Sequence, residues 1–220
     1  MAGCVFTGTT RLDKPGAAIA EDAALAVRGQ AHPYASRGGL KLAHGLDHFA
    51  IDPKDMTCLD VGASTGGFSD VLLQRGAAKV YAVDVGKGQL AWKLRQDSRV
   101  VVLEGVNARS LTRELVPDAV DLIVCDASFI SLEKILPAVL ALAAPAAMLV
   151  ALIKPQFEVG KGKVGKGGVV RDAALHKEVC ERIEAFVGAQ EGWRVIGVTE
   201  SPVLGPAGNK EFLIAARRAP

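Results

Sequence analysis

The sequence has few of the features that mark secreted, metal-binding or strongly polycationic proteins. Its net charge is only +2, so any affinity for nucleic acid must come from a local basic surface. No basic stretch followed by an apolar core opens the chain, so we expect no secretory signal. The cysteines form no pair at metal-ligand spacing, which favours a reduced, cytoplasmic location and predicts no metal site. These four residues are Cys4, Cys58, Cys125 and Cys180.

Long hydrophobic runs are also scarce. The 19 residues at 135–153 carry no charge and meet the minimum length of a membrane span. Pro137 and Pro145 interrupt this run, and we interpret it as an Ala-rich helix followed by a short strand at 147–153. The sequence therefore predicts no contact with a membrane.

The composition is that of a folded α/β domain. Of the 220 residues, 50% are hydrophobic and 23% are charged. From residue 57 onward, short β-rich runs alternate with helical patterns, which indicates a parallel sheet. We expect strands at 57–61, 79–85, 99–103, 121–125 and 148–153, and helices at 39–49, 67–75, 89–96, 132–142 and 173–187. Two more strands, 193–199 and 211–216, flank a Pro/Gly-rich segment, and we expect them to pair antiparallel.

A glycine-rich loop follows the first strand and leads directly into a helix. Glycines let the backbone turn tightly and approach a ligand, and a helix N-terminus offers free N–H groups. The G-x-G-x-x-G spacing of dinucleotide sites is not met, because Ser64 stands where the second glycine is required. The candidate cofactor-binding residues of this loop are Asp60, Gly62, Ser64, Thr65, Gly66, Gly67 and Phe68.

Two polar residues after the next strands complete this cofactor pattern. Asp84 closes the second strand, where a carboxylate can accept both hydroxyls of a cofactor ribose. Asn107 follows the third strand and is placed to read an adenine edge. Together with the loop, they favour a nucleoside–methionine cofactor, S-adenosylmethionine. The alternative is a purely structural corner in which Ser64 or Thr65 caps the helix.

Asp126 and Lys154 end the fourth and fifth predicted strands. Because the carboxyl ends of adjacent parallel strands face one crevice, we expect these two side chains to lie close together beside the cofactor. Such a pair suits proton-transfer chemistry. A partly buried salt bridge with no catalytic part is the alternative.

A glycine-rich segment at 156–170 carries Lys161, Lys163 and Lys166. Residues 160–166 match part of a Walker A motif, but Gly167 replaces the Ser or Thr that ligates magnesium. Lysines on glycine-rich chain contact phosphates without sequence preference, so we interpret the segment as a mobile lid that binds an RNA backbone. An ordinary solvated loop is the alternative.

Six motifs occur in order along the chain: Tyr34–Leu42, Asp60–Phe68, Gly88–Arg95, Asp126–Ser131, Lys154–Glu158 and Gly208–Glu211. Together they resemble the TlyA, or hemolysin A-like, family of ribosomal RNA 2′-O-methyltransferases. The resemblance implies a Rossmann-like methyltransferase fold: a mostly parallel seven-stranded sheet with a terminal antiparallel strand and helices on both faces. It also implies S-adenosylmethionine as cofactor and ribosomal RNA or a ribosomal subunit as partner.

The same resemblance implies a catalytic tetrad of Lys41, Asp126, Lys154 and Glu211. Lys154 would be the base or oxyanion stabiliser, and Asp126, which also adjoins the cofactor, would hold it. Lys41 and Glu211 would position the ribose, and Arg37 would contact RNA. The alternative for Lys41 is a solvated helix lysine, and the alternative for Glu211 is a charge at a strand edge.

Two other functions compete with this enzyme. A non-catalytic RNA-binding or ribosome assembly factor could lose Asp126 or Lys154, and both are present. A membrane-active hemolysin needs a span or a basic amphipathic helix, and we find neither pattern.

The first 30 residues do not show the alternating strand and helix pattern of the rest of the chain. Segments 5–7, 14–16 and 24–27 predict a small β unit with a turn. By resemblance, residues 1–30 correspond to the last β portion of an S4-like RNA-binding module, so that the module is incomplete here. We expect a linker at 31–36 and the FtsJ-like methyltransferase domain at 37–220.

Overall fold

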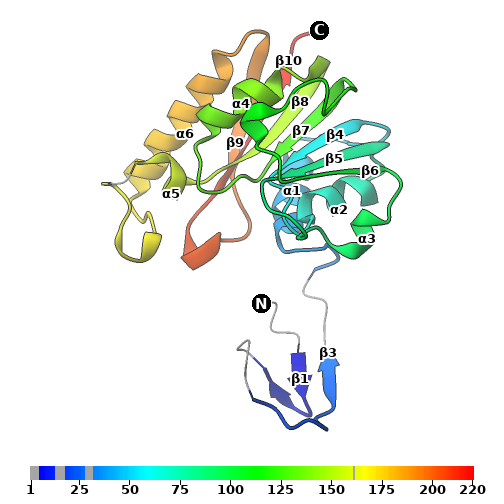
Figure 1. Ribbon diagram of the computed structural model, residues 1–220. Helices are drawn as coiled ribbons and strands as arrows, with labels where there is room; N and C mark the ends of the chain where they lie inside the picture. The colour runs from blue at the N-terminus through cyan, green and yellow to red at the C-terminus, as the bar shows by residue number, and fades with distance from the viewer. Residues whose placement is uncertain (1–4, 13–17, 28–31, 161) are drawn as a thin grey trace. The chain divides into compact units, whose positions relative to one another are not determined.

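The computed structural model describes residues 5–12, 18–27, 32–160 and 162–220. The chain divides into two compact units, Met1–Pro33 and Tyr34–Pro220. The first contains a small sheet of order β2-β1-β3 with antiparallel pairing (Figure 1). Its strands are β1 (Val5–Thr7), β2 (Thr10–Arg11) and β3 (Leu25–Val27). The expected strands at 5–7 and 24–27 are present, and the predicted turn at 14–16 lies outside the described residues.

The second unit is built on a seven-stranded sheet of order β6-β5-β4-β7-β8-β10-β9. The last strand of the chain, β10, is antiparallel to both of its neighbours, and the other strands all run the same way. The predicted Rossmann-like fold is therefore confirmed. The strands are β4 (Thr57–Val61), β5 (Lys79–Asp84), β6 (Val100–Glu104), β7 (Val120–Cys125), β8 (Ala143–Ile153), β9 (Trp193–Glu200) and β10 (Phe212–Arg218).

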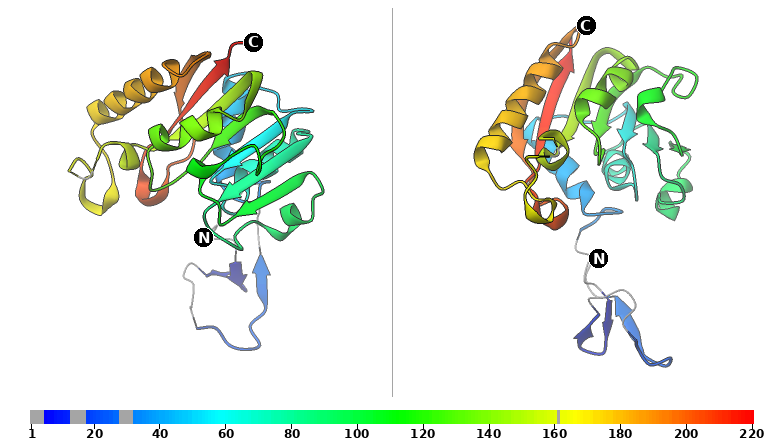
Figure 2. Two further views of the ribbon diagram at one scale, coloured as in Figure 1. Left: turned by 45° about the horizontal axis from the view of Figure 1, so that its top comes forward. Right: turned by 60° about the vertical axis from the view of Figure 1, so that its left-hand side comes forward.

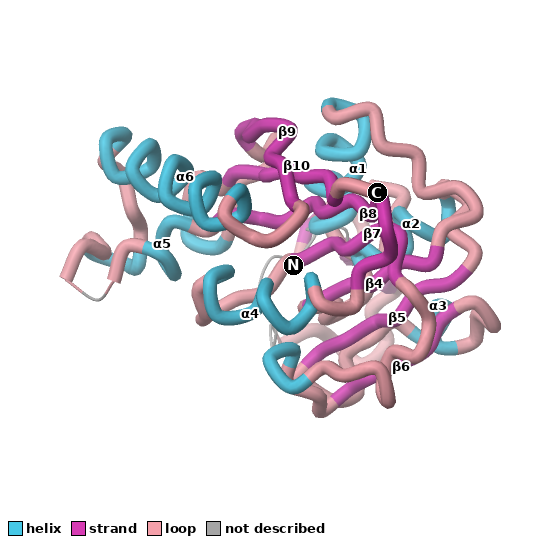
Figure 3. The backbone as a smooth tube through the Cα atoms, turned by 90° about the horizontal axis from the view of Figure 1, so that it is seen from above, coloured by secondary structure: helices cyan, strands magenta, loops and turns pink. Residues whose placement is uncertain are grey.

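Helices cover both faces of this sheet (Figures 2 and 3). On one face Cys58 of β4 packs in a cluster with α1, α2 and α3; on the other, Leu59 packs in a cluster with α4 and α6. This alternation follows from the two-residue period of a strand buried on both sides. The helices are α1 (Gly38–His48), α2 (Gly67–Gln74), α3 (Trp92–Arg95), α4 (Leu132–Leu140), α5 (Pro155–Glu158) and α6 (Ala173–Gly188). The short 3-10 turns are η1 (Ala108–Ser110), η2 (Lys166–Gly168) and η3 (Pro206–Gly208).

The two prolines of the apolar run at 135–153 lie inside secondary-structure elements and not between them. Pro137 lies inside α4, and Pro145 lies inside β8, which begins earlier than predicted. Pro145 is tolerated because the register of β8 on β7 passes from Ala143 directly to Met148, so no ladder bond is needed there. Among the helices within the described residues, none is long and apolar enough to cross a membrane.

The helix predicted at 89–96 is also shorter than expected. The residues before Trp92 are not helical. The backbone N–H groups of Gly88 and Gln89 donate instead to the Glu104 carboxylate, at 2.8 and 3.1 Å. That side chain from β6 thus replaces the first turn, and α3 begins only at Trp92.

The core between α4 and the sheet makes a measurable contribution to stability. Leu136 of α4 is fully buried, so Leu136→Ala should lower the free energy of unfolding by about 2–5 kcal/mol. Urea unfolding followed by circular dichroism measures this loss. Leu115→Ala is the control, since Leu115 is 38% exposed; equal losses in the two variants would contradict the assigned packing.

Candidate active site

The candidate site lies where the order of the sheet reverses. From β4 the chain continues to β5 and β6 on one side and then to β7 and β8 on the other, so the carboxyl ends of β4, β7 and β8 border one crevice. Gly62, Asp126 and Lys154 follow these three strands directly. Two adjoining cavities of about 300 and 480 Å³ open there, and Gly62 and Asp126 line both of them.

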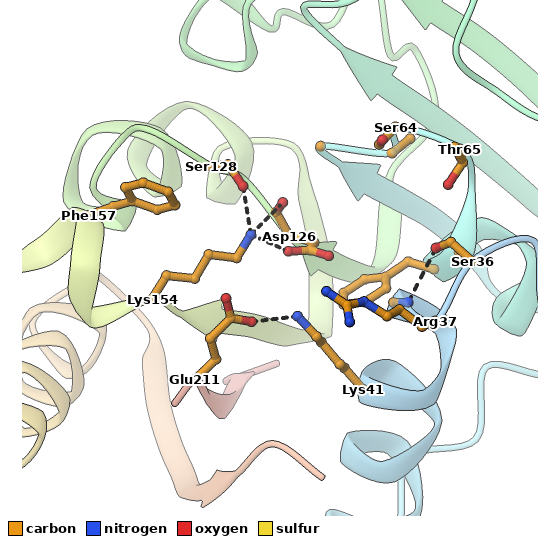
Figure 4. Close-up of a pocket in the computed structure, with 15 residues that line it drawn as sticks. Ser36, Arg37, Lys41, Ser64, Thr65, Asp126, Ser128, Lys154, Phe157 and Glu211 are labelled. Carbon is orange, nitrogen blue, oxygen red and sulfur yellow. Dashed lines mark hydrogen bonds and ion pairs between the residues drawn. The ribbon is translucent and has the colours of Figure 1, made fainter. Parts of the chain in front are cut away.

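The smaller cavity is lined by the four predicted tetrad residues, which form two ion pairs (Figure 4). Lys41 Nζ lies 2.5 Å from Glu211 Oε2, and Lys154 Nζ lies 2.5 Å from Asp126 Oδ1. Lys41 and Lys154 are each 6% exposed and Glu211 is 1% exposed. The readings of Lys41 as a solvated lysine and of Glu211 as an edge charge therefore do not hold.

Lys154 is held by more than its carboxylate partner. Its ammonium also donates to Ser128 Oγ at 2.9 Å and to the backbone carbonyl of Asp126 at 3.3 Å. Burial raises the pKa of the Asp126 carboxyl, and the nearby Lys154 ammonium opposes that rise. Three oxygens thus fix the position of one buried cation at the wall of the cavity.

Glu211 is fixed equally closely by its own surroundings. Besides Lys41, it accepts a hydrogen bond on Oε1 from Gln156 Nε2 at 3.3 Å. The backbone of Gly205 lies against the same carboxylate, and a Cβ added at Gly205 would stand 2.0 Å from Oε1. Only glycine at this position allows the turn before β10 to pack on the carboxylate.

The loop after β4 approaches β7 closely. Gly62 has φ +83° and a Cβ there would lie 2.9 Å from the carbonyl oxygen of Asp126, so this position requires glycine. The backbone N–H of Ser64 donates to Asp84 Oδ2 at 2.8 Å, which ties the loop to the end of β5. The N-cap residue of α2 is Gly66, and no side chain caps this helix. The alternative in which Ser64 or Thr65 caps it therefore does not hold.

The larger cavity combines a polar edge with apolar walls. Asp84 and Asn107 line it together with Val85, Ile130 and Ile135. Asp84 Oδ1 also accepts from the backbone N–H of Gly86 at 2.7 Å, which fixes the carboxylate. A carboxylate beside an apolar slot suits the ribose and base of a nucleoside.

Some predicted site residues lie elsewhere. Asp60 is fully buried and accepts from the backbone N–H and hydroxyl of Ser69 at 2.9 and 2.6 Å, so it supports the loop from beneath. Gly66 packs on Leu94 and lines neither cavity. Thr65, Gly67, Phe68 and Arg37 line the smaller cavity.

Of the predicted RNA-binding lysines, Lys163 and Lys166 line neither cavity, and Lys161 lies outside the described residues. Lys163 pairs with Glu178 at 3.0 Å on the protein surface, and Lys166 is exposed in η2.

Sequence reasoning missed several residues that line the cavities, among them Ser36, Ser128, Phe129 and Phe157. Ser128 and Phe129 lie within the Asp126–Ser131 motif, but spacing alone did not show which members face the site. Phe129 is 89% exposed with φ +65°, and its ring centroid lies 4.9 Å from that of Phe157. An exposed aromatic residue in a left-handed conformation beside a cavity is typical of a functional position.

Residues 34–218 match the family described as FtsJ-like methyltransferase. The chain belongs to the FtsJ-like methyltransferase family. The match spans all four tetrad positions and both cavities. The described residues include no group of three or more His, Cys, Asp or Glu side chains placed to hold a metal ion.

Individual relatives support the predicted resemblance to the TlyA, or hemolysin A-like, family. The chain is 49% identical to the 16S/23S rRNA (cytidine-2′-O)-methyltransferase TlyA of Mycobacterium tuberculosis, over 98% of this chain and 82% of that protein. It is 41% identical to hemolysin A of Brachyspira hyodysenteriae, over 97% and 88%. A solved structure of a "putative hemolysin" from Streptococcus thermophilus has a TM-score of 0.86 at 44% identity, covering 100% of this chain and 80% of that one. The resemblance is thereby confirmed.

The buried Asp60 carboxyl predicts a specific pH dependence of stability. Burial raises its pKa from 3.8 to about 7. The folded protein therefore retains a proton that the unfolded chain loses, and this group's contribution to stability declines as the pH rises from about 4 to 7. Asp60→Asn should flatten this decline in urea unfolding measured across that range. Asp52→Asn, an exposed carboxylate, is the control, and an unchanged pH profile in Asp60→Asn would refute the assignment.

Proposed function

We propose that this protein transfers a methyl group from S-adenosylmethionine to the 2′-hydroxyl of a ribose in ribosomal RNA. The observation that carries the proposal is the pair of buried ion pairs, Lys154–Asp126 and Lys41–Glu211, in a cavity that adjoins a nucleoside-sized one. The activity in the name of the M. tuberculosis relative, cytidine-2′-O-methylation of rRNA, matches this arrangement.

The residues of the larger cavity fit the proposed cofactor. Asp84 would accept the ribose hydroxyls, Asn107 would meet the adenine edge, and Val85 and Ile130 would pack on the base. The glycine-rich loop at 62–67 would receive the methionine portion, because its backbone is open and leads into the N-terminus of α2. The cofactor supplies a methyl group on a sulfonium, whose sulfur leaves as a neutral thioether when the methyl group is transferred.

The tetrad would act on the substrate hydroxyl in the smaller cavity. A 2′-hydroxyl loses its proton as its oxygen attacks the methyl carbon, so a base or a cation must meet that oxygen. Lys154 would take this role, as either base or oxyanion stabiliser, and its contacts with Asp126 and Ser128, which fix its Nζ, support the proposal. Lys41 and Glu211, whose ion pair lies beside that of Lys154 and Asp126 (Figure 4), would orient the ribose.

Other residues suit an RNA substrate. Arg37 is exposed and lines the smaller cavity, where it would meet a phosphate. The exposed ring of Phe129 beside Phe157 offers a surface on which a base can stack. We also propose that residues 1–30 belong to an S4-like RNA-binding module, that 31–36 are a linker, and that 37–220 form the catalytic domain.

The cofactor assignment predicts a binding defect in Asp84→Ala. Loss of the ribose acceptor should weaken S-adenosylmethionine binding by roughly 1–3 kcal/mol, measured by isothermal titration calorimetry. Glu114→Ala, which removes an exposed carboxylate outside both cavities, should bind as the wild type does. Unchanged affinity in Asp84→Ala would remove Asp84 from the cofactor site.

The tetrad assignment predicts that Lys154→Ala stops methyl transfer while cofactor binding persists, because Lys154 faces the substrate cavity. Loss of a general base lowers the rate by about 10²–10⁴-fold. If Lys154 acts as the base, Lys154→Arg should not restore activity, because a guanidinium stays protonated and cannot accept the proton of the hydroxyl. Single-turnover methylation of ribosomal RNA at saturating cofactor measures these rates, and digestion of the product identifies the methylated nucleoside.

Lys177→Ala is the matched control, because Lys177 is an exposed lysine paired only with Glu181 at 3.6 Å among the contacts of the described residues. A Lys154→Ala rate above about a tenth of wild type would refute the base assignment. A base-methylated nucleoside in the wild-type product, with no 2′-O-methyl nucleoside, would refute ribose methylation itself.

A further inference from the structure

The basic loop, which we define as residues 162–170, carries Lys163 and Lys166 on glycine-rich chain. Exposed lysines on such a chain bind phosphate well only if something limits the conformations of the loop. We propose that Asn209 is a positioning residue that holds the basic loop beside the active site, so that Lys163 and Lys166 meet phosphates of the RNA substrate. This inference rests on the proposed function.

Asn209 binds the C-terminal end of the basic loop through both ends of its amide. It is 3% exposed, its Oδ1 accepts from the backbone N–H of Val170 at 3.0 Å, and its Nδ2 donates to the carbonyl of Gly168 at 3.0 Å. One side chain therefore satisfies two backbone groups of the loop, as a neighbouring strand would. The adjacent His176 ring contacts the carbonyl of Val170 at 2.9 Å and adds to the same anchor.

The segment that carries Asn209 also carries the active-site carboxylate. Asn209 precedes Glu211 by two residues, and its carbonyl accepts from the backbone N–H of Gly205 at 2.8 Å. Gly205 itself packs on the Glu211 carboxylate. The same turn thus fixes the carboxylate and the end of the basic loop, and Figure 1 shows η3 and η2 near each other on the lower left of the unit.

A second buried side chain fixes the chain just before the basic loop. Glu158 ends α5, the short helix that begins directly after Lys154. Its carboxylate accepts from Ser131 Oγ at 2.8 Å, from the backbone N–H of Leu132 at 2.9 Å and from Arg182 Nη2 at 3.0 Å. The basic loop therefore extends between two anchors, and each anchor is close in sequence to a tetrad residue.

Between the anchors the loop is open. Glycines at 162, 167 and 168 have no atom within 4 Å of an added Cβ, apart from their own neighbours. Lys166 is exposed, and Lys163 makes only a surface ion pair with Glu178, with both side chains more than half exposed. Such a pair contributes little stability and exchanges readily for a phosphate. Within the loop, the backbone N–H of Gly165 donates to the carbonyl of Val169 at 3.2 Å, and that of Gly168 donates to the carbonyl of Gly165 at 3.1 Å. These bonds shape the turn that carries Lys166, and the two anchors fix the ends of the loop.

A double-mutant cycle tests this role. We compare Asn209→Ala, Lys163→Ala/Lys166→Ala, the combined variant and wild type in binding a fluorescein-labelled RNA oligonucleotide of mixed sequence at several salt concentrations. Asn209→Ala should weaken binding by about 3- to 10-fold, the effect of removing one or two ordinary hydrogen bonds. It should also reduce the slope of log Kd against log salt by about 0.7–0.9 for each phosphate that the lysines no longer neutralise.

The combined variant decides between a positioning and a merely structural role. If Asn209 acts through the two lysines, Asn209→Ala should have no further effect on RNA affinity once they are gone, and the affinity for S-adenosylmethionine should stay at the wild-type value. Gln190→Ala, which removes an amide bonded to Phe186 at the end of α6, is the control. Additive losses in the cycle, or an unchanged salt slope, would overturn the proposal.

A second variant and a methyl-transfer assay distinguish failure of this inference from failure of the proposed function. If Asn209→Ala is too unstable to assay, Asn209→Ser, which keeps a hydroxyl, takes its place in the same cycle, with the same criteria. Absence of methyl transfer to ribosomal RNA by the wild type would refute the proposed function, whereas wild-type transfer with an additive cycle would refute only the role of Asn209.

Discussion

The arrangement of the active site depends on one requirement, which is that each buried ammonium group needs a hydrogen-bond acceptor. Lys41 and Lys154 are almost fully buried, and an unpaired charge there would cost several kcal/mol. Each therefore needs a carboxylate, and the two carboxylates come from different parts of the sheet. Asp126 directly follows β7 and Lys154 directly follows the neighbouring β8, whereas Glu211 directly precedes β10. Insertion of the antiparallel β10 next to β8 is what brings the second pair into the same cavity.

The packing of α1 completes this arrangement. Gly45 lets the helix approach the sheet closely, since a Cβ there would lie 3.2 Å from Leu213 of β10 and 3.4 Å from Val150 of β8. Lys41, one turn earlier, is thereby placed at the end of the sheet where Glu211 lies. Hydrophobic packing sets the position of the helix, and the ion pair takes its geometry from that packing.

Patterns in the sequence predicted one of the two ion pairs and did not predict the other. Buried β-rich runs and the rule for strand ends predicted that Asp126 and Lys154 would meet. The Lys41–Glu211 contact joins residues 170 positions apart, and only the resemblance to a family placed them together. Asp60 shows a different limit. The sequence alone does not tell whether a carboxylate just before a glycine-rich loop faces a ligand or, as Asp60 in β4 does, accepts hydrogen bonds from Ser69 inside the core.

The two cavities share part of their lining, and this has a consequence for the transfer reaction. Gly62, Ser64, Asp126 and Ser128 line both cavities, so a group held in one lies next to a group held in the other. Such a boundary suits direct transfer between two bound molecules, in which neither has to move once both are in place. Ser128 and Asp126 also hold Lys154. If Lys154 acts as proposed, the residues that line both cavities are also the ones that hold its side chain at the reacting oxygen, so the occupation of both cavities and the position of Lys154 depend on the same groups.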